Sequence, residues 1–247
     1  MIPLRDKNPS NITPWLVYAL IAANVLAFLF ELSLDTAARI ELLKTYGFVA
    51  DTAKKALRGE AGLLTGLVLP AFTSMFLHGG GLHLIGNMWF LYIFGDNIEA
   101  RLGRVRFALF YLACGLAATT AQYVLDRGSD IPMVGASGAI AGVLGAYILC
   151  WPRARITTLV PIFYLITFID LPAVAVLGLW FIMQLFGGIA SLGADVVPVA
   201  YGAHIGGFVA GLVLIKLIPQ SRPKKGPRKI TRLPSRKSRN NRNERGR

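Results

Sequence analysis

The sequence has little charge, few acidic residues, three histidines and only two cysteines among its 247 residues. Charged residues make up 16% of the chain and hydrophobic residues 54%, whereas a soluble domain carries about 25% charged residues. Two cysteines exclude a disulfide-rich scaffold, and neither Cys114 nor Cys150 belongs to a pair with metal-ligand spacing, so we expect both to be unpaired. Together with a mean hydropathy of +0.54, the scarcity of charge predicts a membrane protein.

The net charge of +13, which alone is typical of nucleic-acid-binding proteins, is concentrated at one end of the chain. Residues 220–247 carry 12 basic side chains and one acidic side chain, whereas residues 1–219 are nearly neutral. This tail has almost no apolar side chains and repels itself, so we expect it to be disordered. Its simplest role is to bind anionic lipid headgroups at the membrane surface. Specific nucleic-acid binding is not expected, because no aromatic residues lie between the charges.

Six segments are apolar enough to predict membrane-spanning helices, which need about 20 residues each. They are Pro14–Leu32, His83–Ile98, Val105–Leu125, Ser137–Trp151, Pro172–Ala190 and Tyr201–Ile218. One further apolar segment, Ile156–Leu171, is rich in β-branched and aromatic residues and contains Pro161 and Asp170. Because it is short and interrupted, we expect an extended or interfacial segment there rather than a span.

An even number of spans places both termini on one side of the membrane, and the basic residues outside the spans favour the cytoplasm for that side. We therefore expect a cytoplasmic N-terminal segment (residues 1–13), a six-helix domain (14–219) and a cytoplasmic tail (220–247), in a bacterial cytoplasmic membrane. Pro14–Leu32 is long enough to remain as a true span, so no cleavable signal peptide is predicted.

Two polar side chains lie one turn apart at the start of the second predicted span. His83 and Asn87 are four residues apart, so a helix places both on one face. An imidazole N–H and an amide NH₂ that converge inside a membrane suit a developing oxyanion. They also suit plain hydrogen bonding between helices, so the pair alone leaves both interpretations open.

A serine and a histidine stand at the starts of the fourth and sixth predicted spans. Ser137 follows a polar turn, and the first amides of a helix lack an internal partner, so it can offer both a nucleophilic Oγ and an oxyanion donor. An ordinary N-cap serine would occupy the same position. Small residues at helical spacing let two membrane helices approach closely, as a serine must to reach His204 at about 2.6–3.2 Å. These small residues are Gly138, Ala141, Gly142 and Gly145 in the fourth span and Ala203, Gly207 and Gly211 in the sixth.

Four motifs, in this order, resemble those of the rhomboid intramembrane serine proteases, and the resemblance covers roughly residues 14–218. They are FLHGGGLHLIGN (Phe76–Asn87), GDNIEARLG (Gly95–Gly103), GASGAIAG (Gly135–Gly142) and AHIGGFVAG (Ala203–Gly211). The resemblance implies an all-α membrane protein, a rhomboid-like bundle of six transmembrane helices with a membrane-associated first loop. It also implies a serine endopeptidase that cleaves transmembrane segments of membrane proteins with no metal and no cofactor.

The resemblance assigns roles to four residues. It implies that Ser137 and His204 form the catalytic dyad, and that His83, Asn87 and the Ser137 amide form the oxyanion hole. His204 would take the Ser137 proton as Oγ attacks the peptide carbonyl, and would then pass it to the leaving amine. No acidic residue lies near Ser137 or His204 in the sequence, so we expect no third acidic member.

Other positions extend or depart from the family pattern. His78 resembles a histidine of the first loop, to which we assign a structural role. Where some relatives have an aromatic residue one turn after the nucleophile, this chain has Ala141, so aromatic packing against the catalytic histidine must come from elsewhere.

We expect the loop Ser191–Ala200 to cap the site and substrates to enter between the second and fifth spans. The fifth span carries bulky residues such as Trp180, and we expect its truncation to alanine to raise cleavage or leave it unchanged.

Two alternatives to an active protease remain. An inactive relative could use the same fold as a membrane scaffold or quality-control factor, although such proteins lose the serine or the histidine and this chain keeps both. A small transporter could use the polar residues as a pathway, but that fold predicts inverted repeats, and the sequence has no internal repeat. Labelling of Ser137 by a fluorophosphonate would separate the protease from both.

Overall fold

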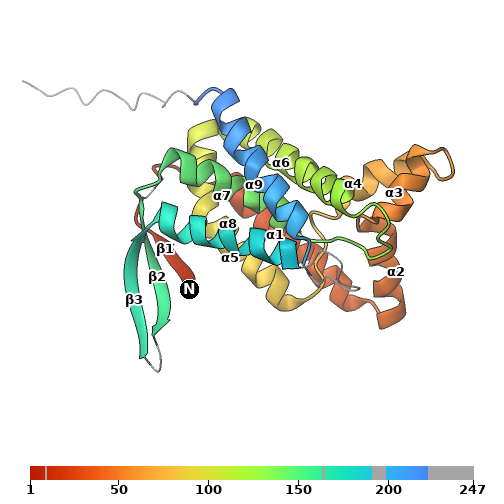
Figure 1. Cartoon of the computed structure of the whole chain (residues 1–247), viewed down its shortest axis with the longest axis horizontal. Helices are drawn as coiled ribbons and strands as arrows, with labels where there is room; N and C mark the ends of the chain where they lie inside the picture. Colours follow the sequence, from red (N-terminus) through yellow and green to blue (C-terminus); the bar gives the residue numbers. More distant parts are fainter. Residues whose placement is uncertain (9, 163–164, 191–198, 222–247) are drawn as a thin grey trace, which may run out of the picture.

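The computed structural model describes residues 1–8, 10–162, 165–190 and 199–221, most of them in helices (Figure 1). The helices are α1 (Trp15–Ser33), α2 (Thr36–Tyr46), α3 (Ala50–Leu57), the π-helix η1 (Leu64–Val68), α4 (Leu69–Thr73), α5 (Gly81–Leu102), α6 (Arg104–Leu125), α7 (Ser137–Cys150), α8 (Ala173–Ala190) and α9 (Tyr201–Leu217). Each of the six predicted spans coincides with one long helix, to within a few residues at its ends. These are α1, α5, α6, α7, α8 and α9.

Three of these helices, among the described residues, are both long and apolar enough to cross a membrane. They are α1, α6 and α8. Helices α7 and α9 are apolar but shorter, with 14 and 17 residues, and 14 residues of α-helix rise only about 21 Å. Helix α5 has 22 residues, but its last two turns contain Asp96, Glu99 and Arg101. The helical bundle is therefore confirmed, whereas six complete membrane crossings remain a prediction.

Glycine brings α7, α9 and α6 into backbone contact. A Cβ on Gly207 or Gly211 of α9 would collide with the carbonyl oxygen of Gly138 or Gly142 on α7. The close approach predicted for these two helices is thus confirmed. On α7 the backbone contact is made by Gly138 and Gly142, while the Ser137 side chain lines a cavity between the helices.

The first loop folds into short helices on the side of the bundle opposite the sheet (Figure 1). Helix α3 turns its alanines inward, since Ala50, Ala53 and Ala56 are buried. Phe48 pairs with Met133 in an antiparallel bridge, and the carbonyl oxygen of Ser74 accepts the amide of Gly135 at 2.8 Å. The loop is thus tied to the segment that leads into α7.

The all-α class needs one correction, because the chain also contains a three-stranded antiparallel sheet in the order β1 (Ile2–Asp6), β2 (Arg155–Ile162), β3 (Leu165–Pro172). Strands β2 and β3 form a hairpin, which confirms the extended segment expected at Ile156–Leu171. β-Branched residues explain the extended backbone. The N-terminal residues supply the third strand, which the sequence analysis did not predict, because their pattern of polar and apolar residues is too short to indicate a strand.

The N-terminal strand is held to the helices by partly buried hydrogen bonds from side chains of α5 and α7. The Tyr147 hydroxyl donates to Asp6 Oδ2 at 2.5 Å, and Asn97 Nδ2 donates to the same oxygen at 2.8 Å. Trp89 Nε1 donates to the carbonyl oxygen of Pro3 at 2.6 Å. Burial raises the pKa of Asp6 above its ordinary value. The tail that we expect to be disordered lies, beyond Ser221, outside the described residues.

Candidate active site

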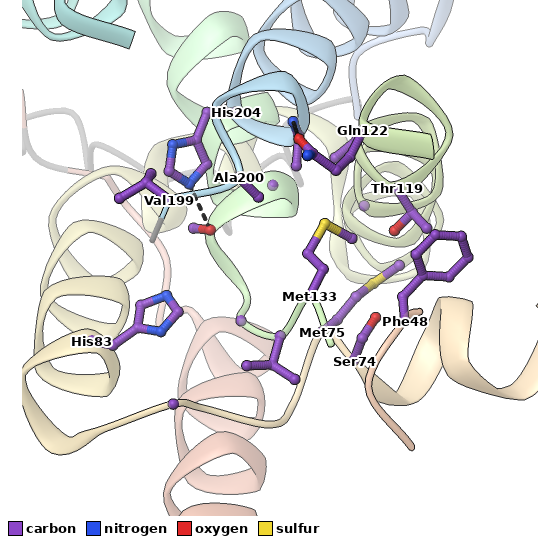
Figure 2. A pocket seen from close by; sticks show the side chains of 18 of the residues that line it. Phe48, Ser74, Met75, His83, Thr119, Gln122, Met133, Val199, Ala200 and His204 are labelled. Carbon is purple, nitrogen blue, oxygen red and sulfur yellow. Dashed lines mark hydrogen bonds between the residues drawn. The ribbon is translucent and has the colours of Figure 1, made fainter. Parts of the chain in front are cut away.

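A cavity of about 1070 Å³ opens between α5, α6, α7 and α9, the first loop and the loop that precedes α7, with one residue of α8 at its side. Figure 2 shows His204, His83 and the thioethers of Met75 and Met133 around it. Phe90 of α5 and Trp180 of α8 also line it, so these two helices together form one wall of the cavity. Of the capping loop Ser191–Ala200, residues 191–198 lie outside the described residues, whereas Val199 and Ala200 line the cavity.

Ser137 lines this cavity, and a glycine makes the turn that leads into α7. Gly135 has φ +124°, a conformation that L side chains rarely adopt, and a Cβ there would lie 2.7 Å from His83 Cε1. The next residues start the helix with Ser137 as its first member, where backbone amides lack an intrahelical acceptor. Glycine at position 135 thus lets the serine backbone approach His83.

His204 reaches Ser137 across the α7–α9 contact. His204 Nε2 lies 2.8 Å from Ser137 Oγ, drawn as the dashed line in Figure 2. The imidazole is on the first turn of α9, and this turn is fixed from α6, where Gln122 Oε1 accepts the amide of Ala203 at 3.2 Å. The structure therefore brings together the two residues that the sequence singled out from different helices.

Two residues of α8 hold the His204 ring, and neither was predicted to do so. His204 Nδ1 lies 2.8 Å from Gln184 Oε1, while Gln184 Nε2 donates to the carbonyl oxygen of Trp180 at 3.4 Å. Because the amide nitrogen is used in that bond, the amide oxygen faces the ring and accepts from Nδ1–H. This tautomer leaves the Nε2 lone pair directed at Ser137. The signal for Gln184 was present, since it is the one polar side chain in Pro172–Ala190.

Trp180 of α8 supplies the aromatic ring that packs against His204, a role that Ala141 on α7 cannot fill. Its ring centroid lies 5.9 Å from that of His204, with an interplanar angle of 39°, and 6.2 Å from that of Phe208. The indole therefore faces the bundle rather than lipid. This placement removes the reason for expecting that truncation of Trp180 would leave or raise activity.

His83 and Asn87 line the same cavity as Ser137 and His204. Asn87 Nδ2 lies 3.0 Å from His78 Nε2 and donates to it, so one amide hydrogen remains for another acceptor. The His78 and His83 rings meet edge to face, with centroids 5.2 Å apart. His78 is buried, and burial with the nearby His83 lowers its pKa to about 4, which keeps it a neutral acceptor.

An ion pair between a buried glutamate and a partly exposed arginine holds the backbone around His78. Glu31 of α1 is fully buried, and its Oε1 accepts the His78 amide at 2.9 Å. Arg39 of α2 donates to the His78 carbonyl oxygen at 3.3 Å and lies 3.6 Å from Glu31 Oε2. Glu31 and Arg39 thus fix both backbone groups of the residue that orients Asn87. The sequence analysis gave His78 a structural role but did not find these partners.

No group of three His, Cys, Asp or Glu side chains that could hold a metal ion occurs within the part of the chain that the structure describes. The two cysteines are free, with Cys114 buried and Cys150 partly exposed. The cavity is lined by the Ser137 hydroxyl, the His83 and His204 imidazoles and the Asn87 amide, and also by the carboxylates of Asp126 and Asp130. A hydroxyl hydrogen-bonded to an imidazole, with further donors nearby, is an arrangement suited to acyl transfer.

Residues 64–221, more than half of the chain, match the Rhomboid domain. RHOMBOID-like protein 4 of Arabidopsis thaliana is 29% identical over 222 residues, which cover 81% of this chain and 52% of that protein. Rhomboid protease GluP of Bacillus subtilis is 35% identical over 137 residues (55% of this chain, 24% of that protein). Presenilin-associated rhomboid-like protein A, mitochondrial, of Danio rerio is 36% identical over 90 residues (36% and 24%). The chain thus spans about half the length, or less, of these relatives.

Proposed function

Because the chain belongs to the rhomboid family of integral membrane proteins, we propose that it is a serine endopeptidase that cleaves transmembrane segments of other membrane proteins. The observation that carries the proposal is the 2.8 Å contact between Ser137 Oγ and His204 Nε2 at the edge of a cavity that also contains His83 and Asn87. Homologues named as rhomboid proteases support the same chemistry.

In this mechanism Ser137 Oγ attacks the carbonyl carbon of the scissile peptide, and His204 Nε2 takes the hydroxyl proton. The C–N bond then breaks as His204 returns that proton to the leaving amine, and an acyl-enzyme remains. Water adds to the ester carbonyl, with its proton passing through the same imidazole, and the carboxylic acid product leaves. Each step uses only Nε2, so the proton on Nδ1 stays in place throughout.

The negative oxygen of each tetrahedral intermediate would lie between the Ser137 amide, the His83 imidazole and the free hydrogen of the Asn87 amide. Loss of one such donor typically lowers kcat about 10²- to 10³-fold. The hydrogen bond from Asn87 to His78 means that the amide is oriented before substrate binds. A donor that needs no reorientation stabilises charge more effectively than a mobile one.

Gln184 takes the place that an acid occupies in many serine hydrolases. It holds Nδ1–H with a neutral amide oxygen, and a neutral group avoids the cost of an anion at membrane depth. Trp180 packs on the same ring from one turn earlier on α8. We assign both as positioning residues for His204.

Six helices, α1 and α5 to α9, would form the membrane domain over residues 14–219, with both termini in the cytoplasm of a bacterium and the 220–247 tail on anionic headgroups. The apolar character of these helices and the distribution of basic residues support this arrangement. Substrates would enter between α5 and α8. The buried residues of α8 are confined to its first turn and a half (Ala173, Val176 and Leu177), which supports α8 as the less firmly held wall.

The test uses the full chain in detergent or bicelles with a fluorescent transmembrane substrate. We expect Ser137→Ala and His204→Ala each to abolish cleavage without changing the unfolding temperature, and the double variant to match either single variant. A fluorophosphonate should label the parent protein and not Ser137→Ala. Cleavage by Ser137→Ala at the parent rate would refute the proposal, and a folded parent protein that is neither labelled nor active would favour the inactive scaffold.

A further inference from the structure

The β2–β3 hairpin projects from the helical bundle as a separate finger next to the start of α8 (Figure 1). At its base it is well anchored, because Ile156 and Thr158 are fully buried and β1 pairs along one edge. Its distal half extends beyond these contacts. The hairpin takes no part in the cavity or in the chemistry proposed above.

The strand register determines which side chains share the outer face of this hairpin. Antiparallel partners point to the same side, so Leu159, Phe168 and Ile2 lie together, followed toward the tip by Ile166 opposite Pro161. The face that carries Ile156 and Thr158 is the buried one. The opposite face therefore packs against no other described element, and in a water-soluble hairpin this face would carry polar residues.

The distal part of that face is apolar, whereas Thr157 and Asp170 lie on the same face nearer the root of the hairpin. Ile166 is 68% exposed, Phe168 64% and Ile2 51%. Large apolar side chains gathered on an unpaired face mark a surface that another apolar phase or molecule covers. Because the hairpin belongs to an integral membrane protein, the phase nearest to hand is the bilayer itself.

Charge separates the root of the hairpin from its tip. Exposed basic residues cluster at the root, where Lys7 also pairs with Asp170 at 2.6 Å. These basic residues are Arg5, Lys7, Arg153 and Arg155. A cationic root beside the exposed side chains of Ile166 and Phe168 matches the interface of a bilayer with anionic headgroups, where cations meet phosphate and apolar side chains reach the acyl boundary.

The hairpin is also continuous with a helix that is long and apolar enough to cross a membrane. Strand β3 ends at Pro172 and α8, a candidate span, begins at Ala173 with no loop between them. The first outward side chain of α8, Val174, is 49% exposed. Trp89, which donates to Pro3 beneath the sheet, is an indole of the kind enriched at membrane interfaces.

We propose that the distal β2–β3 hairpin inserts its Phe168 and Ile166 face into the interface of the leaflet at the α8 N-terminus, with the cationic root on anionic headgroups. The hairpin then anchors the start of α8 to the membrane independently of the helical bundle. This role does not depend on the protease proposal.

The test measures depth in the bilayer. A nitroxide is attached at Phe168→Cys or Ile166→Cys in the full chain with Cys114→Ala and Cys150→Ala, reconstituted in vesicles of phosphatidylglycerol and phosphatidylcholine. Collision rates with oxygen, which partitions into acyl chains, and with a water-soluble nickel chelate are compared. Arg153→Cys, in the exposed turn before β2, is the matched control. We expect several-fold higher oxygen-to-nickel ratios at 166 and 168 than at 153.

Equal ratios at 166, 168 and 153 would overturn the proposal. Strong spin–spin broadening between labels at 168, lost on dilution with unlabelled protein, would also overturn it and identify a second copy as the occupant. Phe168→Trp retains both native cysteines, so it serves if the cysteine-free chain fails to fold. Phospholipids brominated near the carbonyl end of the acyl chain should then quench its added fluorescence, and quenching only by aqueous iodide would contradict insertion.

Discussion

Replacement of Gln184 by leucine removes the acceptor for His204 Nδ1–H and leaves a side chain of similar size on α8. The bond spans 2.8 Å in a partly buried position, and leaving a buried donor unpaired costs about 1–3 kcal/mol. At 1.36 kcal/mol for each tenfold change in rate, that cost corresponds to a roughly 5- to 150-fold fall in kcat. An aspartate-to-asparagine change in a serine protease triad costs about 10⁴-fold because it imposes the wrong tautomer. Leucine does not impose the wrong tautomer of His204 but only removes the group that favours the correct one. We therefore expect the roughly 5- to 150-fold fall in kcat rather than the fall of about 10⁴-fold.

The assay is steady-state cleavage of a fluorescent transmembrane substrate in bicelles, with kcat and KM determined separately. We expect Gln184→Leu to lower kcat and leave KM nearly unchanged, since Gln184 acts on the base and not on the substrate. Gln184→Glu, which keeps an acceptor oxygen, should recover much of the lost kcat. Met183→Leu, at the exposed position that directly precedes Gln184 in α8, is the matched control and should have parent activity.

A Gln184→Leu enzyme with parent kcat would refute the tautomer argument even if Ser137 remained essential. A loss shared equally by Gln184→Leu and Gln184→Glu, with a lowered unfolding temperature in both, would mean that Gln184 stabilises α8 rather than orienting the imidazole.

Four further outcomes are expected. Asn87→Ala should lower kcat about 10²-fold or more while KM changes little, as measured in the same assay, and an effect confined to KM would indicate a role in structure or binding instead. Trp180→Ala should now lower kcat, because the indole packs on the His204 ring, and unchanged fluorophosphonate labelling of this variant would contradict that. Since burial lowers the pKa of His78 to about 4 from 6.5, the unfolded state binds more protons between these values. Stability should therefore rise with pH over that range, and thermal unfolding of His78→Gln should show a flatter profile. Truncation after Gln220 should leave cleavage in detergent unchanged but weaken salt-sensitive attachment to anionic vesicles, and a large loss of detergent activity would show that the tail belongs to the enzyme.

The helices and the pair Ser137 and His204 could be predicted because their signals are local. An apolar run sets a helix, and small residues at helical spacing set which helices meet. The α7–α9 contact follows directly from Gly138, Gly142, Gly207 and Gly211, although the sequence did not decide which stripe of α7 would face its neighbour.

The partners of His204 and His78 could not be predicted, because neither Gln184 nor Glu31 belongs to a motif or a small-residue pattern that links its helix to the histidine. Gln184 is 20 residues from His204, and Glu31 is 47 residues from His78. Only a search for isolated polar residues in apolar spans would have found Gln184 and Glu31, and it would not have matched them to their histidines. The strand at residues 2–6 was missed for a related reason, since its partner β2 is some 150 residues away and a strand that short has weak periodicity.

Helix α8 carries both Gln184 and Trp180, one turn apart, and therefore acts on His204 as a single body. Any outward displacement of α8 that widens the wall between it and α5 withdraws the acceptor and the aromatic support from the imidazole together. The opening motion and the loss of a correctly oriented base are then one event, so the site would not be open to substrate and reactive at the same time. With α8 displaced outward, Ser137 would be unreactive. It would become a competent nucleophile only when α8 moves back after the substrate has entered.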